Sequence, residues 1–273
     1  MRVGRLGEQH AEALEELLVG SPTINIFLLG YLDAMPVEQG QWWGAAEGDR
    51  LAGAAILVPG RLMVPFAPTA AAAQALGRAW HGHIRPCMAV GPRKDVDTIW
   101  HHWVGDRHGV DRWYDQRLYV CREPVPGERP DGFRRAHHDE LEALIANAAE
   151  MELEDLGRDP RHVDEEMFRA AVERRVRQGS TWVMVRSGKI AFQINVGTRT
   201  AWGCQVGGTY VPPEFRGAGL AAEGMRALTR ALLPRYRCIT LHVNEANLPA
   251  VRTYERSGFV ADKAFRLTTL KDA

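Results

Sequence analysis

The pattern of apolar and polar positions predicts a β-hairpin in each half of the chain. Residues 42–58 read WWGAAEGDRLAGAAILV, and residues 182–196 read WVMVRSGKIAFQINV. Each run opens with tryptophan, passes through a polar turn that contains glycine, and ends in a second apolar stretch, which is typical of two antiparallel strands. A segment with helical spacing precedes each hairpin: HAEALEELL in the first half and ELEALIANAAEMELEDL in the second.

The shared order of helix and hairpin indicates a faint internal repeat. Duplication of one domain is favoured over two unrelated α/β domains, and the repeat alone does not decide between them. The segment 121–135, CREPVPGERPDGFRR, is the best linker candidate because it combines prolines, glycines and many charges. From a chain of 273 residues we therefore expect two domains, residues 1–128 and residues 129–273.

The second half continues as alternating strands and helices. A strand at CQVGGTYV is followed by a helix over 219–233 and by a strand at CITLHV. A short helix follows, with Pro249 in its first turn and Gly258 at its C-terminal cap, and a last strand covers about 259–270. In the first half, PTAAAAQALGRAW predicts a helix that is capped by Thr69. The fold class is therefore α/β.

Composition narrows the classes of function. Lys+Arg and Asp+Glu are both 34, so the net charge is zero and we expect neither a nucleic-acid nor a membrane partner. The N-terminus, MRVGRLGEQHAEAL, lacks an apolar signal core, and we expect a cytoplasmic protein. The 4 cysteines are scattered and are expected to be reduced and near the core.

The stretch VPPEFRGAGLAAEG, residues 211–224, has the chemistry of a phosphate-binding turn. The first turn of a helix offers free N–H groups and a partial positive charge, and glycine lets an anion approach the backbone closely. A P-loop is excluded because no lysine follows the glycines. The dinucleotide fingerprint is matched in letters by Gly217, Gly219 and Ala222, but Pro212 and Pro213 separate it from its strand, and too little chain remains for its large sheet.

Two blocks of sequence resemble the GNAT superfamily of acyl-CoA-dependent N-acyltransferases. The first is Val211-Pro212-Pro213-Glu214-Phe215-Arg216-Gly217-Ala218-Gly219-Leu220-Ala221, which matches the Arg/Gln-x-x-Gly-x-Gly/Ala loop after a strand that ends in Val-x-Pro. The second is VNEANLPAVRTYERSGF, in which Asn247, Ala250, Tyr254, Glu255, Gly258 and Phe259 are in register. The resemblance covers about residues 133–273. The whole chain more loosely resembles a two-domain subgroup whose degenerate GNAT-like N-terminal half precedes an intact one.

This resemblance implies two tandem GNAT-like domains, each with a mixed, mostly antiparallel sheet flanked by helices. It also implies that acetyl-CoA is the co-substrate, that no metal takes part, and that the acyl group passes by direct attack to a small-molecule or peptide amine. The strand before the loop is expected to splay from its neighbour and to bond the pantetheine arm. The implied contacts to coenzyme A come from Thr209, Tyr210, Val211, Arg216, Gly217, Ala218, Gly219, Leu220, Ala221 and Asn247.

Tyr254 is implied to protonate the leaving thiolate, although its position three residues after Val251 also fits a core aromatic. Glu152 and Glu154 are candidates for the base that deprotonates the amine. Glu152 interrupts an otherwise apolar helical stripe, and a solvated acidic helix end is the alternative for both. Adjacent histidines such as His101 and His102 point apart on a helix, and we expect no metal site.

An alternative function is a non-catalytic acyl-CoA sensor or interaction module that keeps the loop without turnover. The sequence leaves a homodimer possible, and it does not identify the amine, the acyl-chain preference or the role of the first half.

Overall fold

The computed structural model describes residues 1–85, 87–105 and 110–271, and the chain forms two compact units. The first unit contains Met1–Tyr119, His242–Leu248 and the segment that begins at Ala261. The second contains Val120–Leu241 and Pro249–Val260. Each unit therefore contains segments from both sides of the predicted domain boundary at 128/129. The division into domains 1–128 and 129–273 remains a prediction.

The sheet of the first unit has the order β1-β2-β3-β4-β5-β12-β6. Neighbours pair in antiparallel fashion in β1/β2, β2/β3, β3/β4 and β5/β12, while β4 and β5 are parallel. The predicted first hairpin is confirmed as β2 and β3. The strand bounds are β1 Arg2–Arg5, β2 Trp42–Glu47, β3 Arg50–Val58, β4 Leu62–Phe66, β5 Met88–Pro92, β6 Val110–Cys121 and β12 Val260–Leu270.

Four α-helices of the first unit are α1 (Ala11–Val19), α2 (Ile26–Ala34), α3 (Ala70–Trp80) and α4 (Arg93–Trp103). The predicted cap of α3 is confirmed, because the Thr69 hydroxyl accepts a hydrogen bond from the Ala72 N–H at 3.2 Å.

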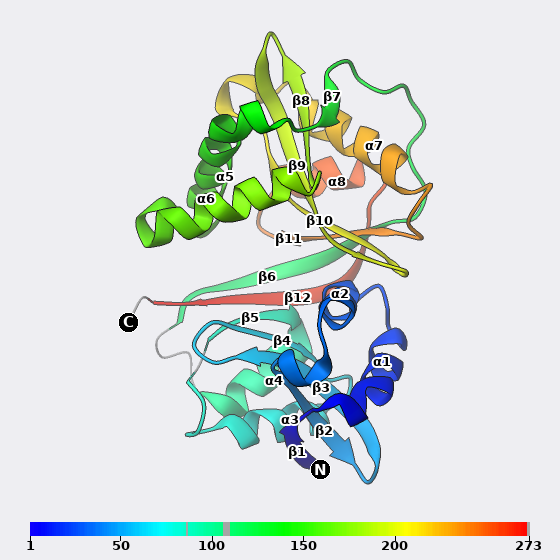
Figure 1. Cartoon of the computed structure of the whole chain (residues 1–273), viewed down its shortest axis with the longest axis vertical. Coiled ribbons are helices and arrows are strands. Elements are labelled where there is room, and N and C mark those ends of the chain that lie inside the picture. Colours follow the sequence, from blue (N-terminus) through cyan, green and yellow to red (C-terminus); the bar gives the residue numbers. More distant parts are fainter. Residues whose placement is uncertain (86, 106–109, 272–273) are drawn as a thin grey trace. The chain divides into compact units, whose positions relative to one another are not determined.

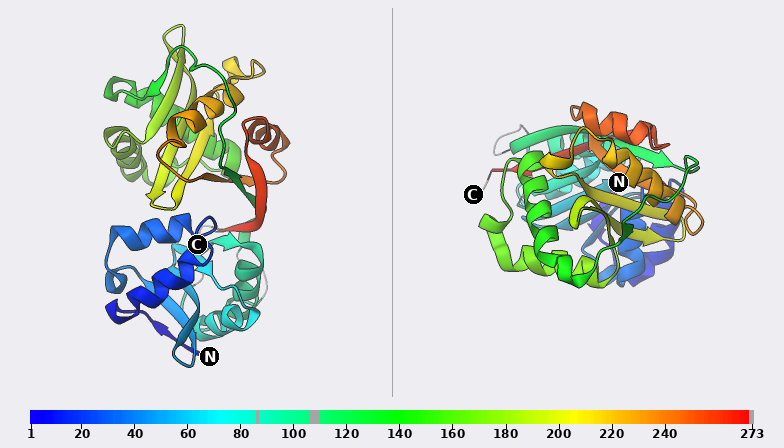
Figure 2. Two further views of the ribbon diagram at one scale, coloured as in Figure 1. Left: turned by 90° about the vertical axis from the view of Figure 1, so that its right-hand side faces the viewer. Right: turned by 90° about the horizontal axis from the view of Figure 1, so that it is seen from above.

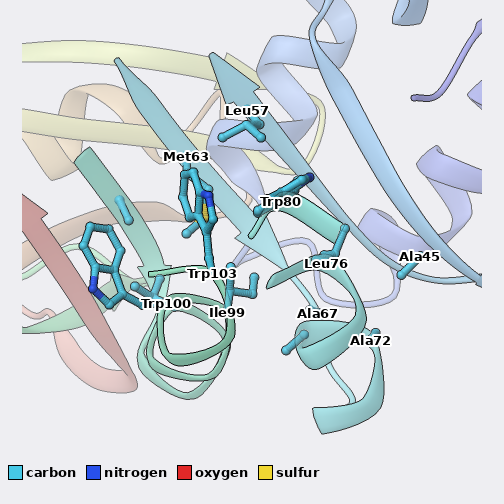
Figure 3. Close-up of a cluster of buried hydrophobic side chains, with 14 of the residues drawn as sticks. Ala45, Leu57, Met63, Ala67, Ala72, Leu76, Trp80, Ile99, Trp100 and Trp103 are labelled. Carbon is cyan, nitrogen blue, oxygen red and sulfur yellow. The ribbon is translucent and has the colours of Figure 1, made fainter. Parts of the chain in front are cut away.

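The core of the first unit is rich in tryptophan. Trp80, Trp100 and Trp103 pack with Leu57 and Met63 of the sheet (Figure 3). The rings meet edge to face, with centroids 5.3 Å apart for Trp80 and Trp103 and 6.0 Å apart for Trp100 and Trp103. Such pairs stabilise a core beyond the burial of their area.

Two ion-pair clusters fix the late segments of the chain in the first unit. On β12, Arg266 binds Asp97 of α4, with Nε 2.8 Å from Oδ1, and also Asp115 of β6. The side chain of Arg266 is only 7% exposed, so its charge is paired out of solvent. In the segment after β11 (Ile239–Asn244), Glu245 accepts a hydrogen bond from Arg93 at 2.7 Å.

The sheet of the second unit has the order β11-β10-β9-β8-β7. Only β10 and β11 pair in parallel, and the other neighbours are antiparallel. This mixed, mostly antiparallel sheet with flanking helices confirms the predicted fold class, and β8 and β9 confirm the second hairpin. The bounds are β7 Phe133–Arg135, β8 Thr181–Arg186, β9 Lys189–Thr200 and β10 Gly203–Tyr210.

Helices cover both faces of this sheet (Figures 1 and 2). Apolar side chains of α5 (Leu141–Leu156) and α6 (Arg161–Arg177) form a core with β8 and β9 on one face. On the other face α7 (Leu220–Leu232) packs closely, because a Cβ added at Gly224 would lie 2.5 Å from the Phe192 ring. The helices α5 and α7 were predicted, whereas α6 was not.

The predicted linker is irregular over 122–132 and is bound to the second unit. Arg230 of α7 donates from Nη1 to the Val125 carbonyl oxygen at 3.1 Å and from Nη2 to that of Glu128. Cys121, Cys204 and Cys238 of this unit, and Cys87 of the first, are free and buried, as expected. In the described part of the chain, every helix is too short or too polar to cross a membrane.

Candidate functional site

The strand β10 leaves its neighbour β11 part of the way along its length. In the described residues the two strands pair only at Cys204–Ile239 and Gln205–Thr240. Beyond this point β10 pairs with β9, and its register shifts between Gly207 and Tyr210. Gly208, with φ of +67°, supplies the left-handed backbone at this bulge. The backbone of Thr209 and Tyr210 therefore lies on the part of β10 that does not pair with β11.

The chain then turns sharply into α7. Pro213–Phe215 form one 3₁₀ turn, and Gly217 and Gly219 adopt left-handed φ values of +81° and +76°. Gly219 is the residue before the helix and has no side chain that could cap it. A Cβ added at either glycine would meet no protein atom within 4 Å. These glycines therefore expose the backbone to open space rather than to a neighbouring element.

Several N–H groups of this turn are free to bind a ligand. The first hydrogen bond that α7 makes to its own start runs from Glu223 N–H to the Gly219 carbonyl. From Gly217 to Ala221, no N–H has an acceptor in the described residues. The N–H of Arg216, by contrast, is donated to the Pro213 carbonyl at 3.2 Å. The N–H groups without an acceptor are thus those of Gly217, Ala218, Gly219, Leu220 and Ala221.

The side chain of Arg216 holds the turn from behind. Its Nε donates to the Val211 carbonyl at 2.9 Å, and its Nη2 donates to both carboxylate oxygens of Glu154 at 2.7 and 2.9 Å. The guanidinium also lies 5.5 Å from the centre of the Tyr210 ring. Four residues singled out in the sequence therefore lie together: Val211, Tyr210, Glu154 and Arg216. Through Glu154, Arg216 anchors the turn to α5.

Tyr254 lies in the last turn of α8 (Leu248–Glu255), and the hydrogen bonds that end this helix fix its position. The Phe259 N–H bonds the Tyr254 carbonyl, the Gly258 N–H bonds that of Glu255, and Gly258 has φ of +87°. This is a Schellman ending, and Gly258 is the predicted cap. The Tyr254 side chain is only 9% exposed, and its ring centre lies 6.1 Å from that of Phe259.

Burial raises the pKa of Tyr254 above its usual value, the Thr209 side chain of β10 acts in the opposite direction, and the negative charge of Asp155 raises the pKa further. The phenol is therefore protonated over the neutral range, which is the state that a proton donor needs.

The acidic end of α5 contributes three carboxylates in different situations. Glu154 is paired with Arg216. Burial raises the pKa of half-buried Glu152, while the positive charges of Arg175 and Arg158 lower it. Asp155 was not singled out in the sequence and is exposed, yet its charge acts on Tyr254, and partial desolvation and the charge of Glu154 raise its own pKa. In the sequence, Asp155 is distinguished only by its place in the acidic run EDL. Helical spacing does not show which of these carboxylates faces a tyrosine that is distant in the sequence.

The remaining predicted residue, Asn247, lies in the turn between β11 and α8. Its N–H donates to the Asn244 carbonyl at 2.9 Å, and its side chain is exposed. The segment to which it belongs packs with the first unit, whereas Tyr254 belongs to the second.

One group of side chains in the described residues has metal-ligand types. Single ligand atoms of His137, Asp139 and Glu140 all lie within 4.8 Å of one another. Glu140 already accepts hydrogen bonds from Arg134 at 2.8 and 2.9 Å and from the His137 N–H at 2.7 Å. These donors hold the Glu140 carboxylate at the start of α5.

Comparison with known proteins identifies a family for much of the second unit. Residues 144–259 match the model of the acetyltransferase (GNAT) family. This segment includes the α7 loop and Tyr254 and ends before β12. No curated protein matches the chain.

Solved structures share the fold over the whole chain. A GCN5-related N-acetyltransferase from Sphaerobacter thermophilus is similar with a TM-score of 0.63 and 17% identity, over 98% of this chain and 94% of that one. An acetyltransferase of the GNAT family from Colwellia psychrerythraea gives a TM-score of 0.60 and 12% identity, over 99% and 100%. A tandem GNAT protein from the clavulanic acid biosynthesis pathway gives 0.55 and 16%, over 98% and 97%. At these identities the likeness establishes the fold.

Proposed function

We propose that the protein transfers an acetyl group from acetyl-CoA to a primary amine, from the premise that residues 144–259 match the model of the acetyltransferase (GNAT) family. The observation that carries the proposal is the row of free N–H donors from Gly217 to Ala221 at the start of α7. Such donors, together with the helix dipole, favour the diphosphate of coenzyme A.

The unpaired part of β10 supplies the second half of the donor site. Backbone groups of Thr209, Tyr210 and Val211 would bond the amides of the pantetheine arm, because β11 does not occupy them there. An N–H near Val211 would stabilise the negative charge that develops on the thioester oxygen. Asn247 would add a contact to the same arm, and its side chain is exposed for this role.

Tyr254 would act as the general acid. Its side chain is buried, and its raised pKa keeps the hydroxyl protonated at neutral pH. As the amine nitrogen bonds to the carbonyl carbon, the carbon–sulfur bond breaks and the sulfur takes the tyrosine proton. The ring would therefore be catalytic and also packed, and these two roles do not exclude each other.

The amine must lose a proton, and the carboxylates at the end of α5 are the candidates. Glu154 is the weakest of these because Arg216 occupies both of its oxygens. Glu152 and Asp155 have raised pKa values, which makes them better acceptors near neutral pH. We assign the base to Asp155, since its charge acts on Tyr254, with Glu152 as the competing residue.

The first experiment is titration calorimetry of the full chain with acetyl-CoA and, separately, with NADH. Saturable binding of acetyl-CoA with no heat from NADH is expected, and the reverse result would exclude the proposal. A second experiment measures thiol release from acetyl-CoA with amines, amino acids, aminoglycosides and peptides. Binding without thiol release from any acceptor would favour a sensor over an enzyme.

A further inference from the structure

A cavity in the second unit lies at the C-terminal end of α7, far from the glycine turn. It has a volume of about 250 Å³. Its walls come from the end of β7, the turn before β8, the strands β8 and β9, and the residues that follow α7 (Figure 1). The lining residues with charge or an aromatic ring are Arg135, Trp182, Arg199, Arg235 and Tyr236.

The charge of this cavity is entirely positive. Arg135, Arg199 and Arg235 line it, and no aspartate or glutamate does. Arg135 lies 5.6 Å from the centre of the Trp182 ring, and Arg199 donates to the Ser180 hydroxyl at 3.0 Å. Both guanidinium groups are therefore held in place by neutral partners.

None of the three arginines forms an ion pair with a carboxylate in the described residues. The acidic side chains of the neighbouring segments are engaged elsewhere. Glu140 binds Arg134, and Glu173 pairs with Arg177 and lies near His138. The chain as a whole has a net charge of zero, so an excess of positive charge is not a general property of its surface.

Three like charges around one cavity repel one another, and because all three arginines are exposed, water screens part of this repulsion. A bound anion would remove this cost. Guanidinium groups bind phosphate and carboxylate oxygens through paired N–H donors, and the ring of Tyr236 gives the cavity an apolar side. The volume lies below the range of about 300–1,000 Å³ that is usual for drug-sized ligands, which favours a small ligand.

We propose that this cavity binds a small polyanion with two or more phosphate or carboxylate groups. The helix α7 separates it from the glycine turn, since the cavity includes Ala231 and Leu232 at one end and the turn precedes Leu220 at the other. Twelve helical steps of about 1.5 Å correspond to roughly 18 Å. The site is thus distinct from that of coenzyme A and does not depend on the acetyltransferase function.

The experiment is titration calorimetry of the full chain with sodium pyrophosphate and, separately, with citrate. The two probes distinguish a phosphate ligand from a carboxylate ligand, and saturable binding of one of them is expected. Arg235→Gln is the main variant, because the side chain of Arg235 has no hydrogen bond or ion pair within the described residues, so the change breaks no such contact there. We expect its affinity to fall by about 10-fold or more, because each charged hydrogen bond contributes on that scale.

Two further variants make the test specific. Arg177→Gln removes the same charge from an exposed position on α6 that does not line the cavity, and it should bind the probe like the parent protein. Gly219→Leu alters the glycine turn, and it too should still bind the probe. The proposal is overturned if neither probe binds, if Arg177→Gln loses as much affinity as Arg235→Gln, or if binding is lost in Gly219→Leu and kept in Arg235→Gln.

Discussion

The helices α3 and α7 each follow a strand, one in each unit, but they begin in opposite ways. Thr69 caps α3 in an extended conformation, and its hydroxyl accepts the N–H of Ala72. Gly219 precedes α7 in a left-handed conformation and offers no side chain at all. A side-chain cap satisfies the helix's own donors, whereas a glycine leaves them for a ligand. The comparison shows that the first turn of α3 has a side-chain acceptor within its own unit, whereas the first turn of α7 leaves its N–H groups for an anion.

Gly219→Leu is the substitution with the largest expected effect, because it puts a side chain at the start of α7. Because a side chain there would fill the open space in front of the N–H groups, acetyl-CoA affinity should fall by at least about 100-fold in calorimetry. The matched control is Gly48→Leu in the β2–β3 turn, where φ is also positive, at +61°, and nothing lies within 4 Å. Both variants carry a backbone strain of about 1–2 kcal/mol, and only the first should lose binding. Equal affinities would mean that the turn does not hold the diphosphate.

Tyr254→Phe separates the binding turn from the chemistry beside it. The ring still packs against Phe259, but the donated proton is gone, so kcat should fall by about 100-fold in a thiol-release assay. The dissociation constant of acetyl-CoA should change by less than about 3-fold. Tyr31→Phe in the first unit is the control for loss of a hydroxyl. Parallel losses of binding and turnover in Tyr254→Phe would make this tyrosine a packing residue.

Thr69→Ala tests the other half of the contrast. Loss of the cap leaves an N–H of α3 without its acceptor, and the free energy of unfolding should fall by about 1 kcal/mol in denaturant titration. Acetyl-CoA binding should stay unchanged. Thr98→Ala, inside α4, removes the same atoms where no cap exists and should not destabilise the protein. If both threonine variants were equally unstable, the cap would contribute nothing.

Glu154→Gln gives the smallest expected effect. The pair with Arg216 is about half exposed, at 44% and 46%, so its loss should weaken acetyl-CoA binding by only about 3-fold. Glu142→Gln is the control, because Glu142 lies on α5 like Glu154, but its exposed pair is with Arg169 of α6, and its loss should change nothing at the turn. A fall in kcat of about 100-fold in Glu154→Gln would instead identify this residue as the base.

Local sequence was sufficient for the elements that position the site. The glycines and prolines of the α7 turn, and Gly258 at the end of α8, have backbone requirements that few other residues meet, so their conformations could be predicted. The anchoring of the turn by Arg216 could not be read from sequence, because only the fold shows that Glu154 lies within reach. The influence of Asp155 on Tyr254 could not be read from sequence for the same reason.

The missed helix α6 illustrates a different limit. Its buried residues Phe168, Val172 and Val176 recur every four positions, which is a helical signal. The remaining positions of α6 are mostly charged. An apolar stripe of three residues is therefore a weaker helical signal than the patterns of α5 before it and of the β8–β9 hairpin after it. The position of β12 between β5 and β6 could not be predicted from local sequence, because these strands lie far apart along the chain.

The position of β12 has a consequence for synthesis on the ribosome. The first unit contains residues 1–119, yet its sheet has β12 (residues 260–270) between β5 and β6. Translation at about 5–20 residues per second delivers most segments of the second unit before this strand. On the ribosome, the sheet of the first unit therefore stays incomplete between β5 and β6 until residues 260–270 have been made.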